Sequence, residues 1–107
     1  MTAIRTAEDI RQALLAGTEV ALLDVREDWE RRLRRVEVSA AVADRHVPLE
    51  AVLAEPAAHT PGQDRVLVVY CAAGARSARA RDAVVGADPS AGGRVLSLAG
   101  GLAAWPA

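Results

Sequence analysis

Hydrophobic and polar residues follow two different periods along this chain. Within residues 7–16 apolar side chains recur three and four positions apart, as on one face of a helix, with Thr6 as the N-cap and Gly17 as the stop. A continuous apolar run of the kind that is buried on both faces of a parallel sheet occupies residues 66–70. A shorter apolar run occupies residues 20–23, and residues 95–98 are apolar apart from Ser97. The pattern therefore predicts buried strands that are separated by helices.

The remaining segments fill the spaces between these strands. Charged or alanine-rich segments with helix-compatible spacing lie at residues 28–35, 50–55 and 77–85, and a short C-terminal helix follows Gly100 and Gly101. Residues 59–64 contain Pro61 and Gly62 and predict a surface loop. Strands that alternate with helices in this way predict an α/β fold with a parallel sheet.

The length and composition fit one domain over residues 1–107. Of the 107 residues 51% are hydrophobic, which is enough for one core that needs no disulfide or bound metal. No apolar run reaches the ~18 residues of a membrane span, and residues 1–12 lack the apolar stretch of a signal peptide, so we expect a cytoplasmic protein. The formal net charge of −1 gives no basic excess for nucleic acid, so neither nucleic acid nor membrane is an expected partner.

The chain contains a single cysteine, Cys71. One cysteine can form no intramolecular disulfide. Together with His46 and His59 it does not supply the four ligands of a structural zinc site, so no metal or other cofactor is expected. Two interpretations of Cys71 remain, a buried and unreactive side chain or a nucleophile. Its neighbours in the sequence decide between them.

Three segments follow directly after predicted strands, at residues 24–26, 71–76 and 99–101. In an open parallel sheet, binding sites form outside the carboxyl ends of the strands. We therefore expect these three segments to converge. Cys71 then lies where this architecture places its chemistry, which favours the nucleophile.

The segment after Cys71 has the composition of a loop that binds anions. Its residues are Ala72, Ala73, Gly74, Ala75 and Arg76, and a helix follows from Ser77. Small residues let the backbone curl so that its N–H groups point inward, and the helix N-terminus adds further N–H groups. Such a ring lowers the pKa of a thiol, and Arg76 offers a planar cation to an anionic substrate. An ordinary strand-to-helix turn around a buried cysteine is the alternative.

Three groups of residues occur in the order and spacing of a known family. They are Leu23-Asp24-Val25-Arg26-Glu27 with Trp29 and Glu30, Val68-Val69-Tyr70-Cys71 with Gly74, Arg76 and Ser77, and Leu98-Ala99-Gly100-Gly101 with Ala104 and Trp105. Together they resemble the rhodanese-like sulfurtransferase domain over nearly the whole chain. The resemblance implies a central, mostly parallel sheet of five strands with helices on both faces. It also implies an enzyme that moves a sulfane sulfur from thiosulfate or a persulfide donor to a thiol, cyanide or a protein acceptor.

The resemblance further implies roles for individual residues. Cys71 is the nucleophile and carries the persulfide, and the amides of residues 72–76 form its cradle, with Arg76 as the anion contact. The residues expected to support the pocket without taking part in the chemistry are Asp24, Arg26 and Ser77. The residues expected to serve a turn or to pack are Gly100, Gly101, Trp29 and Trp105. For the first two supporting residues, a plain strand-end carboxylate and an exposed arginine are the alternative.

One stretch departs from the family pattern. After the Asp-x-Arg-Glu element the family often has Gly-His-Ile-Pro-Gly-Ala, whereas residues 33–39 here are Leu-Arg-Arg-Val-Glu-Val-Ser. This stretch resembles a variant with arginine at the histidine position, seen among rhodanese domains linked to sulfur activation for cofactor and thiolation pathways. Residues 46–49 match the strand that follows, after extra residues around Ala40 to Asp44. We do not expect His46 to be catalytic.

Two other functions remain open. Cysteine phosphatases and arsenate reductases also bind an oxyanion in a loop from cysteine to arginine, but four residues separate Cys71 from Arg76 and their pattern needs one more. The second alternative is a relay or partner-binding module with little small-molecule activity, because Ala72 and Ala75 offer no basic side chain to thiosulfate. Since a single cysteine cannot resolve its own persulfide as an intramolecular disulfide, sulfur transfer of either kind requires an external acceptor.

Overall fold

All neighbouring strands in the sheet run parallel, in the order β2-β1-β3-β4. The structure is a computed structural model that describes residues 6–38, 42–63 and 65–105. Its strands are β1 (Glu19–Asp24), β2 (Ala43–His46), β3 (Arg65–Tyr70) and β4 (Val95–Ser97). Its α-helices are α1 (Ala7–Leu15), α2 (Asp28–Leu33), α3 (Leu49–Ala54) and α4 (Ala75–Ala87), and its 3-10 helices are η1 (Pro56–His59), η2 (Pro89–Ala91) and η3 (Gly101–Ala104).

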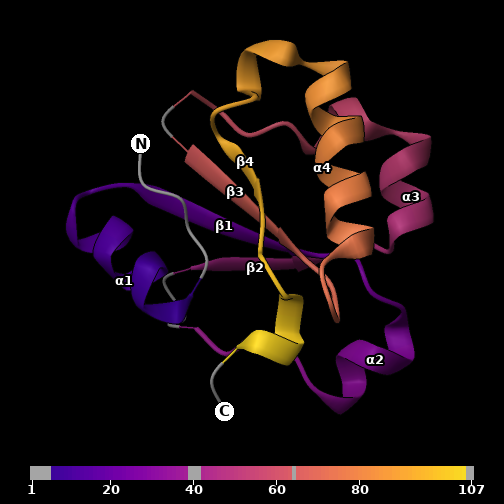
Figure 1. The fold of residues 1–107 in the computed structure, drawn as a ribbon. Coiled ribbons are helices and arrows are strands. Elements are labelled where there is room, and N and C mark those ends of the chain that lie inside the picture. Colours follow the sequence, from indigo (N-terminus) through magenta and orange to yellow (C-terminus); the bar gives the residue numbers. More distant parts are fainter. Residues whose placement is uncertain (1–5, 39–41, 64, 106–107) are drawn as a thin grey trace.

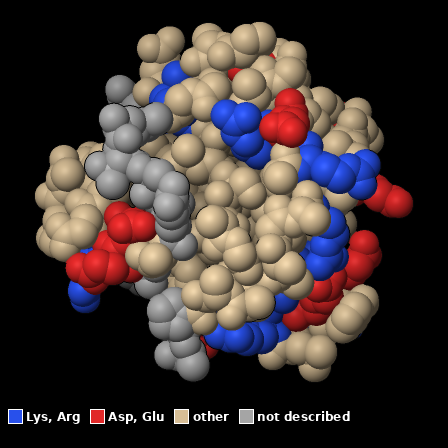
Figure 2. All heavy atoms as spheres, in the orientation of Figure 1, with Lys and Arg blue, Asp and Glu red and all other residues tan. Residues whose placement is uncertain are grey.

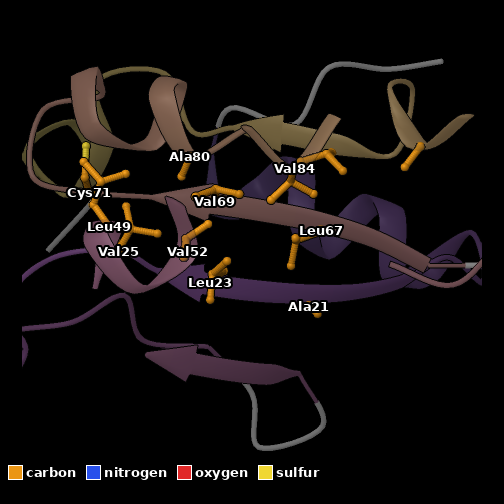
Figure 3. Close-up of a cluster of buried hydrophobic side chains, with 12 residues drawn as sticks. Ala21, Leu23, Val25, Leu49, Val52, Leu67, Val69, Cys71, Ala80 and Val84 are labelled. Carbon is orange, nitrogen blue, oxygen red and sulfur yellow. The ribbon is translucent and has the colours of Figure 1, made fainter. Parts of the chain in front are cut away.

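Helices cover both faces of the sheet, with α1 on one side and α3 and α4 on the other (Figure 1). The apolar run of β3 is continuous because its side chains alternate between two buried clusters. The cluster on the α1 side takes Val66, Val68 and Tyr70 from this strand. The cluster beneath α3 and α4 takes Leu67 and Val69, followed by Cys71, and Figure 3 shows Val69 in the middle of that core and Cys71 at one end of it. The second core therefore ends at the cysteine.

The predicted α/β architecture, with a parallel sheet and helices on both faces, is confirmed with differences in detail. The described residues form four strands, whereas the family resemblance implied five. The helix expected at residues 77–85 begins earlier, at Ala75, because Gly74 with φ 113° serves as its N-cap. The last two of the extra residues, Ala43 and Asp44, belong to β2 itself, while residues 40 and 41 lie outside the described ranges. Of the residues 46–49 that were expected to match this strand, only His46 lies in it, because α3 begins at Leu49. Across the described ranges, no helix is long and apolar enough to cross a membrane.

The two tryptophans, both expected to pack, behave differently. Trp105 is buried in the cluster on the α1 side, as expected. Trp29 lies on α2 with 60% of its surface exposed, so the expectation for this residue is wrong. The physical reason is that α2 buries none of its residues. Polar contacts rather than an apolar face must therefore hold this helix against the sheet.

Candidate active site

Cys71 lies at the end of β3, with its sulfur inside the turn that leads to α4. The amide of Gly74 donates to Cys71 Sγ at 3.0 Å, and the amide of Ser77 donates at 3.4 Å. The hydroxyl oxygen of Ser77 is 3.5 Å from the same sulfur. Because Cys71 is only 1% exposed, these polar groups take the place of water around the sulfur.

The surroundings of Cys71 favour the thiolate. Burial raises the pKa of the thiol, but hydrogen bonds from the hydroxyl and amide of Ser77 lower it, and the amides of Gly74 and Ala73 lower it further. The balance leaves the pKa of Cys71 below its ordinary value. A cysteine buried only among apolar side chains would have a raised pKa and would be unreactive, so the amides distinguish Cys71 from that alternative.

The cradle is built from part of the segment that the sequence indicated. Among residues 72–76, Ala73 and Gly74 act on the sulfur through their amides. Ser77, expected only as support, supplies both an amide and a hydroxyl. Ala75 and Arg76 begin α4. His46, not expected to be catalytic, has its Nε2 2.7 Å from the backbone carbonyl oxygen of Arg26.

Two glycines fix the shape of the cysteine loop. Gly74, with φ 113°, lets the chain turn from the strand into α4. Gly101 has φ 58°, and a Cβ atom there would overlap the carbonyl oxygen of Cys71. That close approach lets the amide of Leu102 donate to the Cys71 carbonyl at 2.8 Å. The turn expected at Gly100 and Gly101, both with positive φ, therefore packs directly on the cysteine loop.

Asp24 and Arg26 form a buried ion pair at the end of β1. Arg26 Nε and Nη2 donate to the two carboxylate oxygens of Asp24, each at 2.9 Å. Burial raises the pKa of Asp24, but the hydrogen bonds and charge of Arg26, together with a hydrogen bond from Arg31, hold that pKa below its usual range. Only 3% of Arg26 is exposed, so the alternative of an exposed arginine is wrong. Its guanidinium also donates to the carbonyls of Glu30 and Arg34, at 3.4 and 2.5 Å, and so ties α2 to β1.

A second arginine, Arg31 of α2, joins this network. Its guanidinium lies 3.1 Å from Asp24 Oδ2, 3.3 Å from Asp44 Oδ2 and 3.3 Å from the hydroxyl oxygen of Tyr70. Burial, with a further contribution from the two carboxylates, raises the pKa of Tyr70 to about 12, so its phenol stays neutral at neutral pH. These contacts to β1, β2 and β3 supply the polar attachment that α2 needs in the absence of an apolar face.

The attached helix α2 places Glu30 against Arg76, in the first turn of α4. Arg76 Nη1 and Nη2 donate to Glu30 Oε1 and Oε2 at 2.6 and 2.9 Å. The hydrogen bonds from Arg76 lower the pKa of Glu30 to about 2, and Glu30 raises the pKa of Arg76. The sequence predicted a guanidinium open to an anion, whereas both terminal nitrogens contact a carboxylate, and 34% of the Arg76 side chain is exposed. Its role as a substrate contact stays a prediction.

The three strand-end segments converge as predicted. The amide of Val25 donates to the carbonyl of Tyr70 at 3.0 Å and joins the end of β1 to the end of β3. The amide of Ala103 donates to the carbonyl of Ala72 at 2.9 Å and joins the segment after β4 to the cysteine loop. Figure 1 shows these strand ends meeting next to α2.

Sequence reasoning missed two neighbours of this site, Glu30 and Ser97. Glu30 belongs to one of the family-like groups of residues, but no local pattern pairs it with Arg76, 46 positions further along the chain. Ser97 ends β4, and its hydroxyl oxygen lies 2.7 Å from that of Ser77. In the sequence it is one polar residue within an apolar run, which is the only signal that could have singled it out.

A family model for the rhodanese-like domain matches residues 6–107. A human single-domain sulfurtransferase is 21% identical, with a TM-score of 0.65 over 94% of this chain and 92% of its own. A rhodanese homologue from Thermus thermophilus is 24% identical, with a TM-score of 0.58 over 96% of this chain and 100% of its own. A Rhodopseudomonas palustris protein described as a possible tyrosine phosphatase is 23% identical, with a TM-score of 0.57 over 96% of this chain and 78% of its own.

Curated proteins give no match to the sequence. With identities of 21 to 24%, the solved structures are similar to this chain in fold, and they carry names of two different activities. The family model covers the three converging strand ends together with the cysteine loop. This chain therefore belongs to the rhodanese-like domain family.

Proposed function

We propose that this domain is a sulfurtransferase that carries a sulfane sulfur as a persulfide on Cys71. The observation that carries the proposal is the ring of amides from Ala73, Gly74 and Ser77 around a sulfur whose pKa is lowered. Inward-pointing N–H groups stabilise a thiolate and equally the anionic outer sulfur of a persulfide. Membership of the family, and the fold shared with a human single-domain sulfurtransferase, support the same reaction class.

The reaction proceeds in two displacements on sulfur. In the first, the Cys71 thiolate attacks the outer sulfur of thiosulfate, the S–S bond of the donor breaks, and sulfite leaves with the bonding electron pair. A protein persulfide reacts in the same way and leaves as a thiolate. In the second, cyanide or an acceptor thiolate attacks the outer sulfur, and Cys71 leaves as the thiolate. The acceptor comes from outside, because the chain has a single cysteine.

The Arg76–Glu30 pair bears on which donor the site takes. A carboxylate at both terminal nitrogens of the guanidinium neutralises the charge of Arg76 in the first turn after the cysteine loop. A dianion such as thiosulfate gains less from such a neutralised pair than from a free arginine. A protein persulfide, which is held by contacts between the two protein surfaces, depends less on this electrostatic attraction.

A partner-binding sulfur relay is the second candidate, and the exposed surface of α2 favours it. Trp29 and Leu33, one helical turn apart, are 60% and 79% exposed. Tryptophan is enriched among the residues that dominate protein interfaces. Arg32 and Arg35 contribute to a groove of about 460 Å³, and Figure 2 shows basic and acidic side chains next to one another over this part of the surface. Because α2 also carries Glu30, a protein bound there would lie next to the cysteine loop.

The test of the proposed function is the formation of thiocyanate from thiosulfate and cyanide, with Cys71→Ser and Ser90→Ala as variants. We expect turnover by the wild type and by Ser90→Ala, which changes an exposed serine outside the site, and none by Cys71→Ser. Turnover by Cys71→Ser at the wild-type rate would refute the persulfide mechanism. The relay is favoured by two results together. The wild type would react slowly with thiosulfate, and it would take sulfur from a protein persulfide at a rate that does not depend on salt concentration.

A further inference from the structure

Ser97, the last residue of β4, lies next to Ser77 inside the structure that holds the cysteine. The two hydroxyl oxygens are 2.7 Å apart, and either can be the donor. Ser77 Oγ is also 3.5 Å from Cys71 Sγ and 3.1 Å from the carbonyl oxygen of Gly74. Because Ser77 is fully buried, these neighbours rather than bulk water decide where its proton points.

The number of protons fixes the direction of these bonds when the sulfur is ionised. A hydroxyl has one proton to donate and two lone pairs, whereas a thiolate can only accept. If Ser77 donates to the Cys71 thiolate, it has no proton left for Ser97. The short contact between the two hydroxyls then requires Ser97 to be the donor.

The carbonyl oxygen of Gly74 competes with the sulfur for the Ser77 proton, and it is not left without a hydrogen bond when that proton turns away. The carbonyl of Gly74 also accepts from the amide of Ala78 at 3.1 Å, so it stays hydrogen-bonded when the Ser77 proton turns to the sulfur. The bonds then run in one direction, from Ser97 to Ser77 to Cys71. In such a chain each bond polarises the next, so the bond to the sulfur is strengthened by the donor behind it.

We propose that Ser97 is a positioning residue for Cys71, because its hydroxyl donates to Ser77 Oγ and so directs the Ser77 proton to the sulfur. The inference rests on the proposed function only in taking Cys71 as the reacting group. Among the hydrogen bonds of the described residues, that of the Ser97 hydroxyl goes to Ser77 Oγ and not to the sulfur, so Ser97 acts through Ser77. Charged groups on the described elements that pack here include Arg76 of α4, paired with Glu30 of α2, and Arg81 of α4, whose guanidinium donates to the carbonyl of Val95 in β4 at 3.1 Å. Neither β4 nor η3 itself carries a charged side chain.

The test follows the ultraviolet absorbance of the thiolate as a function of pH, with Cys71→Ser as the blank. Cys71 is the only cysteine, so the signal reports one group and does not require the sulfur to be accessible. We expect Ser77→Ala to raise the measured pKa by about one unit and Ser97→Ala by about 0.3 unit, because the second bond acts only through the first. Ser97→Thr restores the wild-type value, and the control Ser90→Ala leaves it unchanged.

A double variant separates positioning from a general effect on packing. In the Ser77→Ala background, Ser97→Ala should cause no further shift, because the bond that it supports is already absent. Equal shifts in both backgrounds, or no shift in the wild-type background, would overturn the proposal. If Ser97→Ala disturbs folding, Ser97→Val and Ser97→Thr form a pair of equal shape that differs in the hydroxyl. This titration is independent of sulfur transfer, so a domain without sulfurtransferase activity would leave the result intact.

Discussion

The carboxylate of Glu30 binds the guanidinium of Arg76 with both oxygens, at 2.6 and 2.9 Å, and joins α2 to the first turn of the helix that follows Cys71. Bidentate pairs of this kind hold the arginine in one orientation as well as neutralising its charge. Glu30 itself is held because α2 is attached to the strand ends through Arg26 and Arg31. A series of contacts thus connects the buried Asp24 with the first turn of α4, through Arg26 and Arg31 to α2 and from there through Glu30 to Arg76.

The first prediction concerns Arg76. Arg76→Ala leaves the Glu30 carboxylate without its partner, facing an anionic donor, so we expect persulfide formation from thiosulfate to slow about tenfold, or about 1.4 kcal/mol. Stability should change by at most about 1 kcal/mol, since the pair is partly exposed. Arg76→Lys should recover part of the rate, because an ammonium carries the charge without the fork. Stopped-flow sulfite release and urea unfolding check both, and a large stability loss with unchanged sulfur transfer would assign Arg76 to the fold.

The second prediction is the dependence of stability on acid. The pKa of Glu30 in the folded state is about 2, below its ordinary value of 4.5, so the folded protein binds a proton at this group less readily than the unfolded chain. The contribution of Glu30 to stability is therefore complete above pH about 4.5 and is lost as the pH falls toward about 2. We expect the free energy of unfolding, measured with urea between pH about 4.5 and about 2, to fall less steeply with decreasing pH for Glu30→Gln than for the wild type.

The matched control for this pH series is Glu19→Gln, which removes a carboxylate from an exposed ion pair with Arg65. Glu19 and Arg65 begin β1 and β3, whereas the candidate site lies where these strands end. We expect Glu19→Gln to follow the wild-type pH profile more closely than Glu30→Gln does. Identical profiles for the wild type and Glu30→Gln would show that the pair contributes nothing to folding.

The third prediction concerns the close approach of the turn after β4 to the cysteine loop. Gly101→Ala places a Cβ on the carbonyl oxygen of Cys71 at a backbone φ of 58°, so we expect a loss of about 2 kcal/mol or more and loss of sulfur transfer. Gly62→Ala is the control, because its Cβ would meet no atom within 4 Å. Thermal unfolding measures both, and equal melting temperatures for the two variants would contradict the contact.

The fold was largely predictable from the sequence, and the prediction that was wrong has a physical reason. The apolar runs of β1 and β3 identified buried parallel strands because both faces of each are covered. The convergence of the strand ends, and with it the location of Cys71, followed from that architecture. Trp29 was misplaced because α2 is held by ion pairs and not by an apolar face, which no periodicity reveals.

The partners of the candidate site were less predictable than its location. That Arg76 binds Glu30, and that Ser77 meets Ser97, depends on how three separate segments pack. Neither pairing leaves a local mark in the sequence, since ion pairs and hydroxyl contacts across elements have no fixed spacing. The pKa of Cys71 was predictable in direction from the small residues that follow it, because their amides are free to turn inward.

The fourth prediction is that the length of the loop between Cys71 and Arg76 determines whether the site reacts with sulfur donors or binds phosphate. The amides of Gly74 and Ser77 lie 3.0 and 3.4 Å from Cys71 Sγ, so the loop of four intervening residues closes tightly around the cysteine sulfur. One glycine inserted after Gly74 should widen the ring, abolish sulfur transfer and create weak affinity for vanadate, at little entropic cost. Vanadate inhibition and thiocyanate formation measure the two effects. Cys71-dependent hydrolysis of an aryl phosphate by the unmodified protein, faster than its reaction with thiosulfate, would favour a phosphatase.

The central claim, that Cys71 accepts a sulfane sulfur, is tested most directly by intact-protein mass spectrometry after incubation with thiosulfate. We expect the wild type to gain the mass of one sulfur atom, and cyanide or dithiothreitol to remove it. Cys71→Ser should gain none, because the chain has no other cysteine. A wild type that gains no sulfur from thiosulfate or from a persulfide donor, or a Cys71→Ser variant that gains it equally, would contradict the account.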